Sequence, residues 1–461
     1  MQIPEHIFRG YDMRGRVGPE VTPELVELVG KAYATYLWDQ SGAKPDVIVG
    51  RDLRPSSEEL SEALIAGILS TGADAVDVGA APTPVVNFSY HYLRKTGVAM
   101  VTASHNPSHD NGLKLKRAPQ RPICGADLQD VLAIAKSGRF RTGKGLRAEA
   151  STIPAYIDAI VERLRPCRGL RVVVDGGNGS GSQTTPDLLR ALGCEVIEIF
   201  CDPDGTFPNH HPDPSVPANM VDLQAKVRET GAAIGFGLDG DGDRLGVVDD
   251  EGRFIQADTF ARALVREALA QKPGRIVIDV TCTESLTADI EMHGGEAVPA
   301  KCGYPNLLVK LSEGPQYLLG IEVSGHLFFN EPFFDFDDGT FAACRIASYL
   351  ANTRQSMSSI VDDPMLPVRV QTPQIRLPAP DATKFQVVEE LGRWLASHES
   401  VKRTDFTDGV KAWISNGWAL ARAANTAPQI VLRVESNSAE DAEGIVGLVK
   451  PKLEELIQAD S

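Results

Sequence analysis

A serine at the end of a predicted strand is the first candidate for chemistry in this sequence. Ser104 comes just after an apolar run at residues 97–101 and is followed by His105, Asn106 and Pro107. The run predicts a buried strand, and Asn-Pro prevents it from leading directly into a helix. Because α/β proteins bind ligands at the carboxyl ends of strands, this hydroxyl is placed for ligand contact. A Ser/Thr turn without chemical function is the alternative interpretation.

Three aspartates that alternate with glycines form the second candidate: Asp239, Asp241 and Asp243, followed by Arg244. Alternate side chains of an extended segment point the same way, so the carboxylates converge. Their mutual repulsion favours a divalent cation, and Mg²⁺ fits because it combines few carboxylates with phosphate oxygens. An EF-hand would need glycine sixth and glutamate twelfth between two helices, but this chain has Arg244 and Asp250 between predicted strands. A plain acidic turn is the remaining alternative.

Three further patterns carry less information. Residues 175–181 are rich in glycine after a predicted strand, but their spacing differs from G-x-G-x-x-G, so we interpret them as a tight turn. No Walker A sequence occurs, so nucleotide-dependent phosphoryl transfer has no support. A metal site at His210 and His211 is conceivable, although the Pro-rich segment 202–217 favours an ordered loop.

Two segments contain arginines that could bind phosphate. Residues 8–15 are punctuated by glycines and carry two arginines, whose planar guanidinium suits a phosphate, although loop arginines are more often only solvated. Arg422, Asn425 and Thr426 fall in a tight loop between two predicted strands. These side chains and the backbone N–H groups of a turn are what a phosphate monoester needs, but an ordinary hairpin explains them equally well.

The elements that position these candidates follow a repeated βα pattern. Strands of β-branched residues alternate with helical segments in residues 47–101, 172–236 and 276–321. In each copy of the repeat, a polar cluster follows the third strand. The cluster contains Ser104 in the first copy, the three aspartates in the second and residues 322–326 in the third. We therefore expect three related domains whose loops face one cleft.

The last part of the chain differs from this repeat. Prolines between residues 364 and 380 predict a linker and an edge strand, and a helix, three strands and a terminal helix follow. The predicted fold class is α/β, with three related mixed-sheet α/β domains plus a C-terminal α+β domain around a central cleft. The expected boundaries are residues 1–149, 150–253, 254–365 and 366–461.

Composition narrows the class of protein. A length of 461 residues predicts three or four domains, and a net charge of −16 argues against nucleic acid or an anionic membrane as partner. Any phosphate site must therefore gather local cations. Seven scattered cysteines without a CxxC pair indicate a reducing compartment rather than disulfides or zinc. Without a signal peptide or an apolar run of about 18 residues, we expect a cytoplasmic protein.

Together these motifs resemble the α-D-phosphohexomutase superfamily, and within it the bacterial phosphomannomutase/phosphoglucomutase branch. The resemblance covers essentially the whole chain and rests on residues 8–15, 50–54, 102–107, 239–244, 320–326 and 422–428. It implies four domains around a cleft, the first three of one α/β kind. It also implies interconversion of hexose 1-phosphate and 6-phosphate, with mannose and/or glucose as sugar, through a phosphoserine and a 1,6-bisphosphate.

The resemblance implies specific catalytic roles. Ser104 would carry the phosphoryl group, and one of its phosphate oxygens would join the three aspartates in holding Mg²⁺. Lys114 and Arg14 would provide proton transfer and charge stabilisation, and a lysine base would need a lowered pKa. Arg244 would bridge the loop that holds Asp239, Asp241 and Asp243 (the metal loop) and the loop that holds Ser104 (the serine loop).

Substrate-binding roles are implied for a second set of residues: Tyr11, Tyr304, Glu322, Ser324, His326, Arg422, Asn425 and Thr426. Glu322 and Ser324 would bond sugar hydroxyls with His326 close by, and the last three residues of the set would hold the phosphate remote from the serine. Tyr11 would line the entrance. The expected partner is a phosphorylated hexose, the expected activator is hexose 1,6-bisphosphate, and the expected state is a monomer or weak dimer.

Three departures from the family pattern leave the preferred sugar open. Ala424 stands where the phosphate loop usually has serine, Thr281 where lysine is common, and Tyr304 where histidine or tryptophan is expected. They are expected to weaken phosphate binding by the third and fourth domains. Phosphoglucosamine mutase is the alternative among enzymes, and a catalytically silent sugar-phosphate-binding protein is the alternative outside them. The intact serine and aspartates favour an enzyme.

Overall fold

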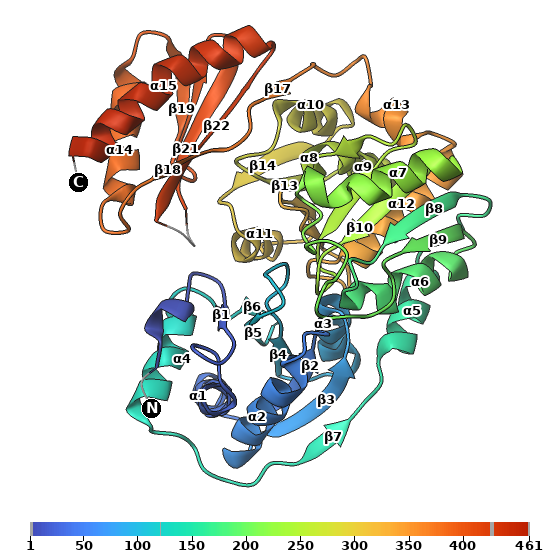
Figure 1. The fold of residues 1–461 in the computed structure, drawn as a ribbon, viewed down its shortest axis with the longest axis vertical. Helices are drawn as coiled ribbons and strands as arrows, with labels where there is room; N and C mark the ends of the chain where they lie inside the picture. The colour runs from blue at the N-terminus through green and yellow to red at the C-terminus, as the bar shows by residue number, and fades with distance from the viewer. Residues whose placement is uncertain (1–2, 120, 425–427, 460–461) are drawn as a thin grey trace.

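The protein is a chain of four sheet-containing units, seen here in a computed structural model that describes residues 3–119, 121–424 and 428–459. In Figure 1 the first unit lies at the bottom, the second lies at the right, the sheet of the third lies in the centre, and the fourth lies at the upper left. Within the described ranges, no helix combines the length and the apolar character needed to cross a membrane. The predicted α/β fold class with a C-terminal α+β unit is confirmed.

The first sheet has seven strands in the order β1-β5-β4-β2-β3-β7, with β6 beside β5. Its strands are β1 (Met13–Arg16), β2 (Asp46–Arg51), β3 (Asp74–Ala80), β4 (Gly97–Val101), β5 (Asp110–Arg117), β6 (Arg121–Pro122) and β7 (Arg147–Glu149). Its helices are η1 (Glu5–Ile7), α1 (Pro23–Ser41), α2 (Ser57–Ser70), α3 (Thr83–Tyr92) and α4 (Ala126–Ser137). Helix α1 begins as the Thr-Pro-Glu sequence predicts, with Thr22 Oγ1 accepting the Leu25 N–H at 3.3 Å.

The second sheet, β12-β11-β10-β8-β9, and the third sheet, β14-β13-β15-β16, continue the chain. Their strands are β8 (Arg171–Asp175), β9 (Glu195–Ile199), β10 (Ile234–Leu238), β11 (Leu245–Val248), β12 (Phe254–Ile255), β13 (Arg275–Asp279), β14 (Glu296–Ala300), β15 (Tyr317–Ile321) and β16 (Leu327–Phe329). Their helices are α5 (Ile153–Val161), η2 (Ser180–Gln183), α6 (Thr185–Ala191), η3 (Pro217–Met220), α7 (Val221–Thr230), α8 (Ala257–Phe260), α9 (Arg262–Gln271), α10 (Glu284–Met292), α11 (Tyr304–Leu311), α12 (Gly339–Thr353) and α13 (Met357–Val361).

Four strands have the same order in all three sheets: β3-β2-β4-β5, β9-β8-β10-β11 and β14-β13-β15-β16. The first three strands of each set are parallel and the last is antiparallel. The loop between the third and fourth strands therefore leaves the equivalent edge of each sheet. This confirms the predicted threefold repeat and places the serine, aspartate and 322–326 loops in equivalent positions.

One apolar core is shared by the first three units. It contains Val86 of α3, Phe236 of β10 and Phe341 of α12, all nearly inaccessible to solvent. A separate cluster fills the other face of the first sheet, beneath α1, α2 and α4. Because burying a common apolar surface stabilises one arrangement of the three units, the shared core also holds their loops together.

The fourth unit has its own core and a six-stranded antiparallel sheet, β17-β22-β21-β20-β19, with β18 beside β22. Its elements are β17 (Val370–Gln371), β18 (Ile375–Pro378), α14 (Lys384–Ser397), β19 (Val401–Asp405), β20 (Val410–Ile414), β21 (Gly417–Ala423), β22 (Gln429–Ser436) and α15 (Ala439–Ala459). Helices α14 and α15 cover one face of the sheet (Figure 1). The sequence prediction missed β19, because this edge strand is largely polar and exposed and shows no apolar alternation.

Lys116 on β5 is buried between the first and third units without a hydrogen bond for its ammonium group among the described residues. Its Nζ lies 5.9 Å from the centre of the Phe336 ring. Burial lowers the pKa of Lys116, although Asp337 and Asp335 oppose that shift. We expect Lys116→Met to raise the free energy of unfolding by about 1–2 kcal/mol, because it removes a buried charge that lacks hydrogen bonds.

The pH dependence of this effect has a definite sign. The unfolded chain binds more protons than the fold between the lowered Lys116 pKa and the ordinary lysine value, so wild-type stability rises with pH in that window. The advantage of Lys116→Met should therefore shrink as pH rises, which denaturant melts at several pH values measure. Exposed Lys136, which pairs with Glu5, supplies the control: Lys136→Met should change stability by less than about 0.5 kcal/mol. A destabilised Lys116→Met protein would contradict the prediction.

Candidate functional site

Ser104 lies in the loop between β4 and β5 and is completely buried. Its backbone is in the left-handed region, with φ of 52°, and its N–H donates to Thr102 Oγ1 at 2.8 Å. Its Oγ donates to Asp239 Oδ2 at 2.8 Å and lies 3.3 Å from His105 Nδ1. The serine thus lies in a turn, in the left-handed region, and its hydroxyl points at the acidic cluster of the second unit.

The three aspartates of the β10–β11 loop converge as the alternation predicts. Asp239, Asp241 and Asp243 are buried, and each offers an oxygen within 4.8 Å of the others. Thr83 Oγ1 donates to Asp241 Oδ2 at 2.7 Å, which anchors the cluster to α3 of the first unit. Oδ1 of Asp241 and Oδ1 of Asp243 are buried without a hydrogen-bond donor among the described residues. Buried carboxylate oxygens with unused lone pairs fit a hard cation such as Mg²⁺.

Lys114 on β5 neutralises part of this cluster. Its Nζ donates to Asp241 Oδ2 at 2.7 Å and to Asp243 Oδ2 at 2.5 Å. Burial disfavours its charge, but the two carboxylates outweigh burial and raise the pKa of Lys114. Burial likewise pushes the pKa of Asp241 upward, yet Lys114 holds it below its ordinary value, whereas burial and the neighbouring carboxylates raise the pKa of Asp239.

These directions bear on the expected roles. A lysine that acts as a base needs a lowered pKa, and the structure shifts the pKa of Lys114 the other way. Lys114 is therefore an ammonium in this arrangement, suited to stabilising negative charge. Of the two roles that the resemblance implied, proton transfer and charge stabilisation, this direction favours the second.

Arg14 of β1 extends over the serine loop. It donates from Nε to Asp12 Oδ2 at 2.8 Å and from an NH group to the carbonyl of Ala103 at 3.1 Å. A weaker contact of 3.4 Å reaches Asn106 Oδ1. The guanidinium is thereby fixed beside Ser104, with its charge partly balanced by Asp12.

Arg244 connects the metal loop with the loop after β15, and its charge also acts on His105 of the serine loop. Its backbone N–H donates to Asp239 Oδ1 at 3.0 Å, and its Nε donates to His326 Nε2 at 2.9 Å. His326 Nδ1 lies 2.9 Å from Asp337 Oδ2. Because Arg244 Nε can only donate, His326 Nε2 is the acceptor of this contact, while Nδ1 faces Asp337. Asp337 was not identified from the sequence, because it lies eleven residues beyond His326 in a separate loop.

The 322–326 loop presents two unused polar atoms. Glu322 Oε1 accepts the Gly303 N–H at 3.2 Å, while Glu322 Oε2 and Ser324 Oγ are buried without a hydrogen-bond partner among the residues described. Asp279 at the end of β13 holds this loop by accepting the Val323 N–H at 2.9 Å. Unpaired acceptor and donor groups of this kind match the hydroxyls of a sugar.

Tyr11 and Tyr304 close the space between the first and third units. Their rings meet edge to face at 5.9 Å, Tyr11 OH donates to the Cys302 carbonyl at 3.0 Å, and Tyr304 OH donates to the Tyr11 carbonyl at 3.3 Å. Gly303 is required here, because a Cβ on it would lie 2.2 Å from the Tyr11 hydroxyl. Tyr11, predicted at the entrance, thus spans the two units.

Arg422 ends in a polar environment at the edge of the fourth unit. Its Nε has no hydrogen-bond partner in the described part of the chain, and Asp408 and Asp279 help to raise its pKa against burial. Asn425 and Thr426, the other predicted phosphate contacts, lie outside the described residues. Lys384, which the sequence reading did not single out, donates from Nζ to the Ala424 carbonyl at 2.6 Å and brings a cation to this loop.

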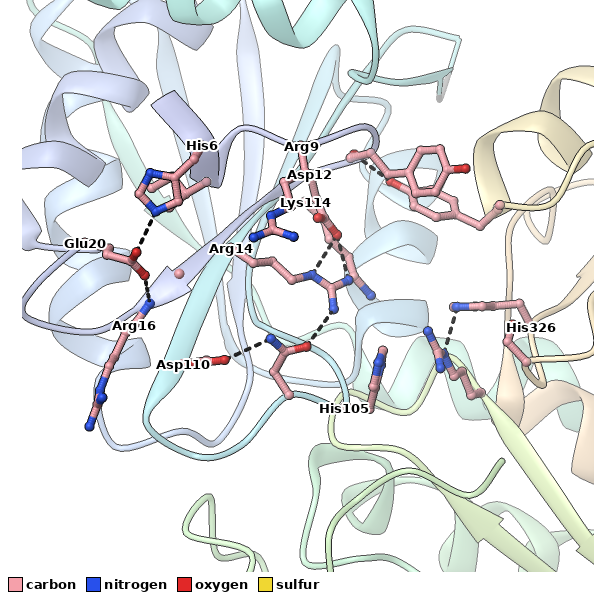
Figure 2. A pocket seen from close by; sticks show the side chains of 18 of the residues that line it. His6, Arg9, Asp12, Arg14, Arg16, Glu20, His105, Asp110, Lys114 and His326 are labelled. Carbon is pink, nitrogen blue, oxygen red and sulfur yellow. Dashed lines mark hydrogen bonds and ion pairs between the residues drawn. The ribbon is translucent and has the colours of Figure 1, made fainter. Parts of the chain in front are cut away.

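A cleft of about 550 Å³ lies between the first and third units, and its lining includes Lys114, Tyr304 and Glu322 but not Ser104, the three aspartates or Arg422. Figure 2 shows Arg14, Lys114, His105 and His326 on its walls, and its lining also includes Arg9, Arg16 and Arg244. Burial, followed by Arg244 and Arg14, lowers the pKa of His105, so this imidazole is neutral. Five Arg and Lys side chains and four carboxylates line this cleft, so cations are in slight excess there in a protein of net charge −16.

Comparison with known proteins places this architecture. Four models of the phosphoglucomutase/phosphomannomutase family match in order: alpha/beta/alpha domain I at residues 5–142, domain II at 154–252, domain III at 257–367 and the C-terminal domain at 374–450. A phosphomannomutase/phosphoglucomutase of Pseudomonas putida is 38% identical over 452 residues, which is 98% of this chain and 96% of that protein. The chain belongs to the phosphoglucomutase/phosphomannomutase family.

Further relatives agree with this assignment. A phosphoglucomutase of Neisseria gonorrhoeae is 35% identical over 457 residues, covering 98% of this chain and 97% of that protein. The crystal structure of a phosphoglucomutase/phosphomannomutase family protein from Burkholderia thailandensis is 35% identical, has a TM-score of 0.91, and covers 99% of this chain and 98% of its own. The family resemblance predicted from the sequence motifs is confirmed.

The departures from the phosphoglucomutase/phosphomannomutase pattern have a clear structural setting. Thr281 turns inward, and its N–H and hydroxyl both donate to Asp279, which in turn holds the 322–326 loop. Ala424 offers only its carbonyl, which Lys384 binds. Tyr304 packs against Tyr11 across the cleft. Thr281, acting through Asp279, and Tyr304, acting through Tyr11, thus both support the walls of the cleft.

Proposed function

We propose that the protein interconverts the 1-phosphate and 6-phosphate of a hexose, mannose and/or glucose, through a phosphoserine at Ser104 and a hexose 1,6-bisphosphate. Family membership makes the chain a hexose-phosphate mutase. The sugars, the phosphoserine and the cofactors belong to the proposal. The observation that carries it is the buried Ser104 hydroxyl, which lies 2.8 Å from the acidic cluster and beside a cationic cleft.

Asp239, Asp241 and Asp243, together with a phosphate oxygen on Ser104, would hold Mg²⁺. The unpaired carboxylate oxygens described above support this fit. A bound Mg²⁺ would offset negative charge on the transferring phosphoryl group. The aspartates and Lys114 keep this charge environment buried, where electrostatic stabilisation is strongest.

The reaction has two balanced halves. In the first, a free hydroxyl oxygen of the sugar phosphate attacks the phosphorus on Ser104; the Oγ–P bond breaks, a sugar O–P bond forms, and the hydroxyl proton passes to a base. In the second half, Ser104 Oγ attacks the other phosphate of the bisphosphate; an Oγ–P bond forms, the sugar O–P bond at that end breaks, and the freed sugar oxygen takes back the proton from the base. Charged Lys114 and Arg14 would stabilise the transferring group.

The two ends of the sugar need two phosphate sites. The serine loop takes one end, and Arg422 with Asn425 and Thr426 would bind the other, while Glu322 and Ser324 bond the hydroxyls between them. Because each end must face Ser104 in turn, the bisphosphate would reorient inside the cleft. Hexose 1,6-bisphosphate supplied from outside would phosphorylate Ser104 and start the cycle, which makes it the expected activator.

An isomerisation assay tests the proposal. The protein is incubated with mannose, glucose or glucosamine 1-phosphate, Mg²⁺ and a trace of hexose 1,6-bisphosphate, and the 6-phosphates are measured. Turnover of mannose or glucose 1-phosphate is expected. Faster turnover of the glucosamine substrate would instead favour phosphoglucosamine mutase, and binding without turnover of any substrate would identify the silent sugar-phosphate-binding alternative.

A further inference from the structure

Arg54, just after β2, is a fully buried arginine that the reaction scheme above does not use. Its two terminal NH groups donate to four backbone carbonyls of the serine loop. The distances are 2.7 Å to Ser104, 2.7 Å to Asn106, 2.5 Å to Pro107 and 3.0 Å to Asp110. A guanidinium has five N–H donors, and this one commits four of them to one loop.

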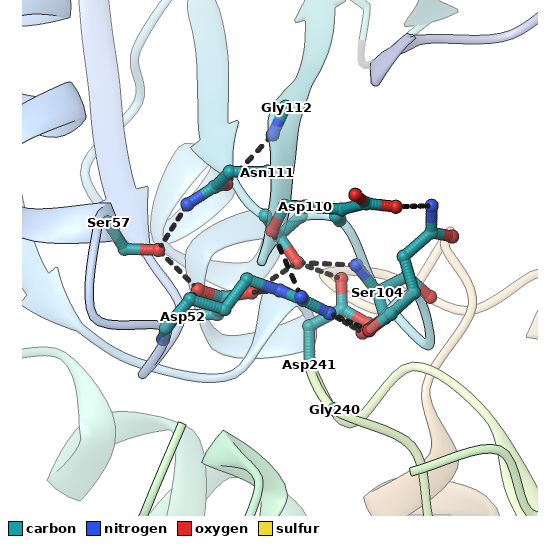
Figure 3. A network of polar contacts seen from close by, with 12 residues as sticks. Asp52, Ser57, Ser104, Asp110, Asn111, Gly112, Gly240 and Asp241 are labelled. Atoms are coloured by element: carbon teal, nitrogen blue, oxygen red, sulfur yellow. Dashed lines mark hydrogen bonds and ion pairs between the residues drawn. The ribbon is translucent and has the colours of Figure 1, made fainter. Parts of the chain in front are cut away.

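The fifth donor of Arg54 fixes the guanidinium from the other side. Its Nε donates to Asp52 Oδ2 at 3.0 Å, and Asp52 also accepts from Thr102 Oγ1 at 2.8 Å and Ser57 Oγ at 2.5 Å. Asn111 of β5 donates to the same Ser57 hydroxyl at 2.9 Å. Figure 3 shows this continuous network between β5, Asp52 and the Ser104 loop. The Arg54 charge is therefore both balanced and oriented.

The network acts on the backbone on both sides of Ser104. The N–H of Ser104 is held by Thr102, and its carbonyl is held by Arg54. A non-glycine residue at φ of 52° occupies an unfavourable region that persists only where surrounding contacts impose it. In this conformation Ser104 Oγ faces Asp239 at 2.8 Å. Without the pull on its carbonyl, the loop can relax and turn the hydroxyl away.

The second unit closes over Arg54 and completes its confinement. The Phe207 ring lies 5.1 Å from the guanidinium carbon, in a cation–π contact. Gly205 packs so closely that a Cβ on it would lie 1.9 Å from the Leu53 carbonyl. The loop that contains Phe207 therefore ties the position of Arg54 to the unit that carries the aspartates.

We propose that Arg54 is a positioning residue for phosphoryl transfer, which gathers the carbonyls of the serine loop and holds Ser104 in the left-handed conformation that aims Oγ at the acidic cluster. The inference rests on the proposed function. Arg54 does not border the cleft, so its loss should leave sugar-phosphate binding almost unchanged and reduce the chemical step. A displacement of the nucleophile by about 1 Å is enough to cost about 100-fold in rate.

The test compares Arg54→Ala and Arg54→Lys with wild type. We expect kcat to fall by about 10- to 100-fold in both, with KM within about threefold of wild type. A lysine is a single donor point and cannot span four carbonyls, so it should not substitute. Methylguanidinium should partly restore Arg54→Ala and leave wild type unchanged. Arg51→Ala is the matched control, because Arg51 is the last residue of β2, close to Arg54 in the sequence, and pairs with Glu58 and Asp77 outside the network.

Hydrogen exchange supplies a readout that does not depend on activity. Peptides covering residues 102–110 should exchange faster in Arg54→Lys than in wild type, while peptides from the third and fourth units stay unchanged. If Arg54→Ala does not fold, Arg54→Lys and Phe207→Leu replace it, and the same lower kcat, nearly unchanged KM and faster exchange of residues 102–110 are expected. Arg54→Lys with kcat within twofold of wild type, or with unchanged loop exchange, would overturn the proposal. An inactive wild-type protein would refute the proposed function instead, and the exchange comparison would still decide the role of Arg54.

Discussion

Ser104→Ala should abolish the mutase reaction, with kcat lowered by about 10⁴-fold or more. The hydroxyl that would carry the phosphoryl group is buried and hydrogen-bonded to Asp239, and alanine offers no oxygen in its place. The isomerisation assay with added hexose 1,6-bisphosphate measures the loss. Intact-mass spectrometry should find an adduct of roughly 80 Da on wild type and none on the variant.

Ser108 in the same loop provides the matched control. Ser108→Ala removes a hydroxyl of the same kind from a half-buried position outside the network around Ser104, so activity and the phosphate adduct should remain. Persistent isomerisation by Ser104→Ala would eliminate Ser104 as the phosphoryl carrier. If Ser104→Ala and Ser108→Ala are both inactive, the loop tolerates neither change. The intact masses of the two variants then decide which serine is phosphorylated.

Asp243→Asn should remove the response of the protein to Mg²⁺. In wild type, a metal bound only by the folded state should add about 2.7 kcal/mol of stability at a hundredfold excess over its dissociation constant. Asp243 offers a buried oxygen without a donor and has few other partners, so the amide should weaken the ion's hold without disturbing the loop. Thermal melts with and without Mg²⁺ measure this difference. Activity should fall by about 100-fold or more, because the charge on the transferring group is no longer offset.

Chelation and a surface variant complete the metal experiment. EDTA should lower wild-type activity and melting temperature together, and restored Mg²⁺ should reverse both. Asp222→Asn removes an exposed carboxylate from α7 of the same unit, so it should keep the full Mg²⁺ response. An Asp243→Asn protein that Mg²⁺ stabilises as strongly as wild type would place the ion elsewhere.

Local patterns in the sequence predicted much of the architecture correctly. The apolar run before Ser104 is β4 at the predicted residues, and the Thr-Pro-Glu signal begins α1. The threefold βα repeat is visible because strand and helix periodicities depend on neighbouring residues. The convergence of Asp239, Asp241 and Asp243 follows from alternation within one short segment, so spacing alone predicted it.

Contacts between distant segments could not be read in the same way. Lys114 seemed a candidate base, but Asp241 and Asp243, more than a hundred residues away, raise its pKa. Arg244 donates to His326, which lies beside Asp337, and no pattern in the sequence predicted that contact. These outcomes depend on how the units pack, and no periodicity records that.

By itself, the sequence determined which residues could do chemistry here and the repeated elements that carry them, because each motif is encoded within a few neighbouring residues. Only the tertiary structure decided the charge states of these residues and the directions in which their side chains point. Packing of the first three units around one core buries Ser104 against Asp239, pairs Lys114 with carboxylates and places Arg54 over the serine loop. The physical reason is that burial and Coulomb interactions depend on distances in space, which a linear order of residues does not contain.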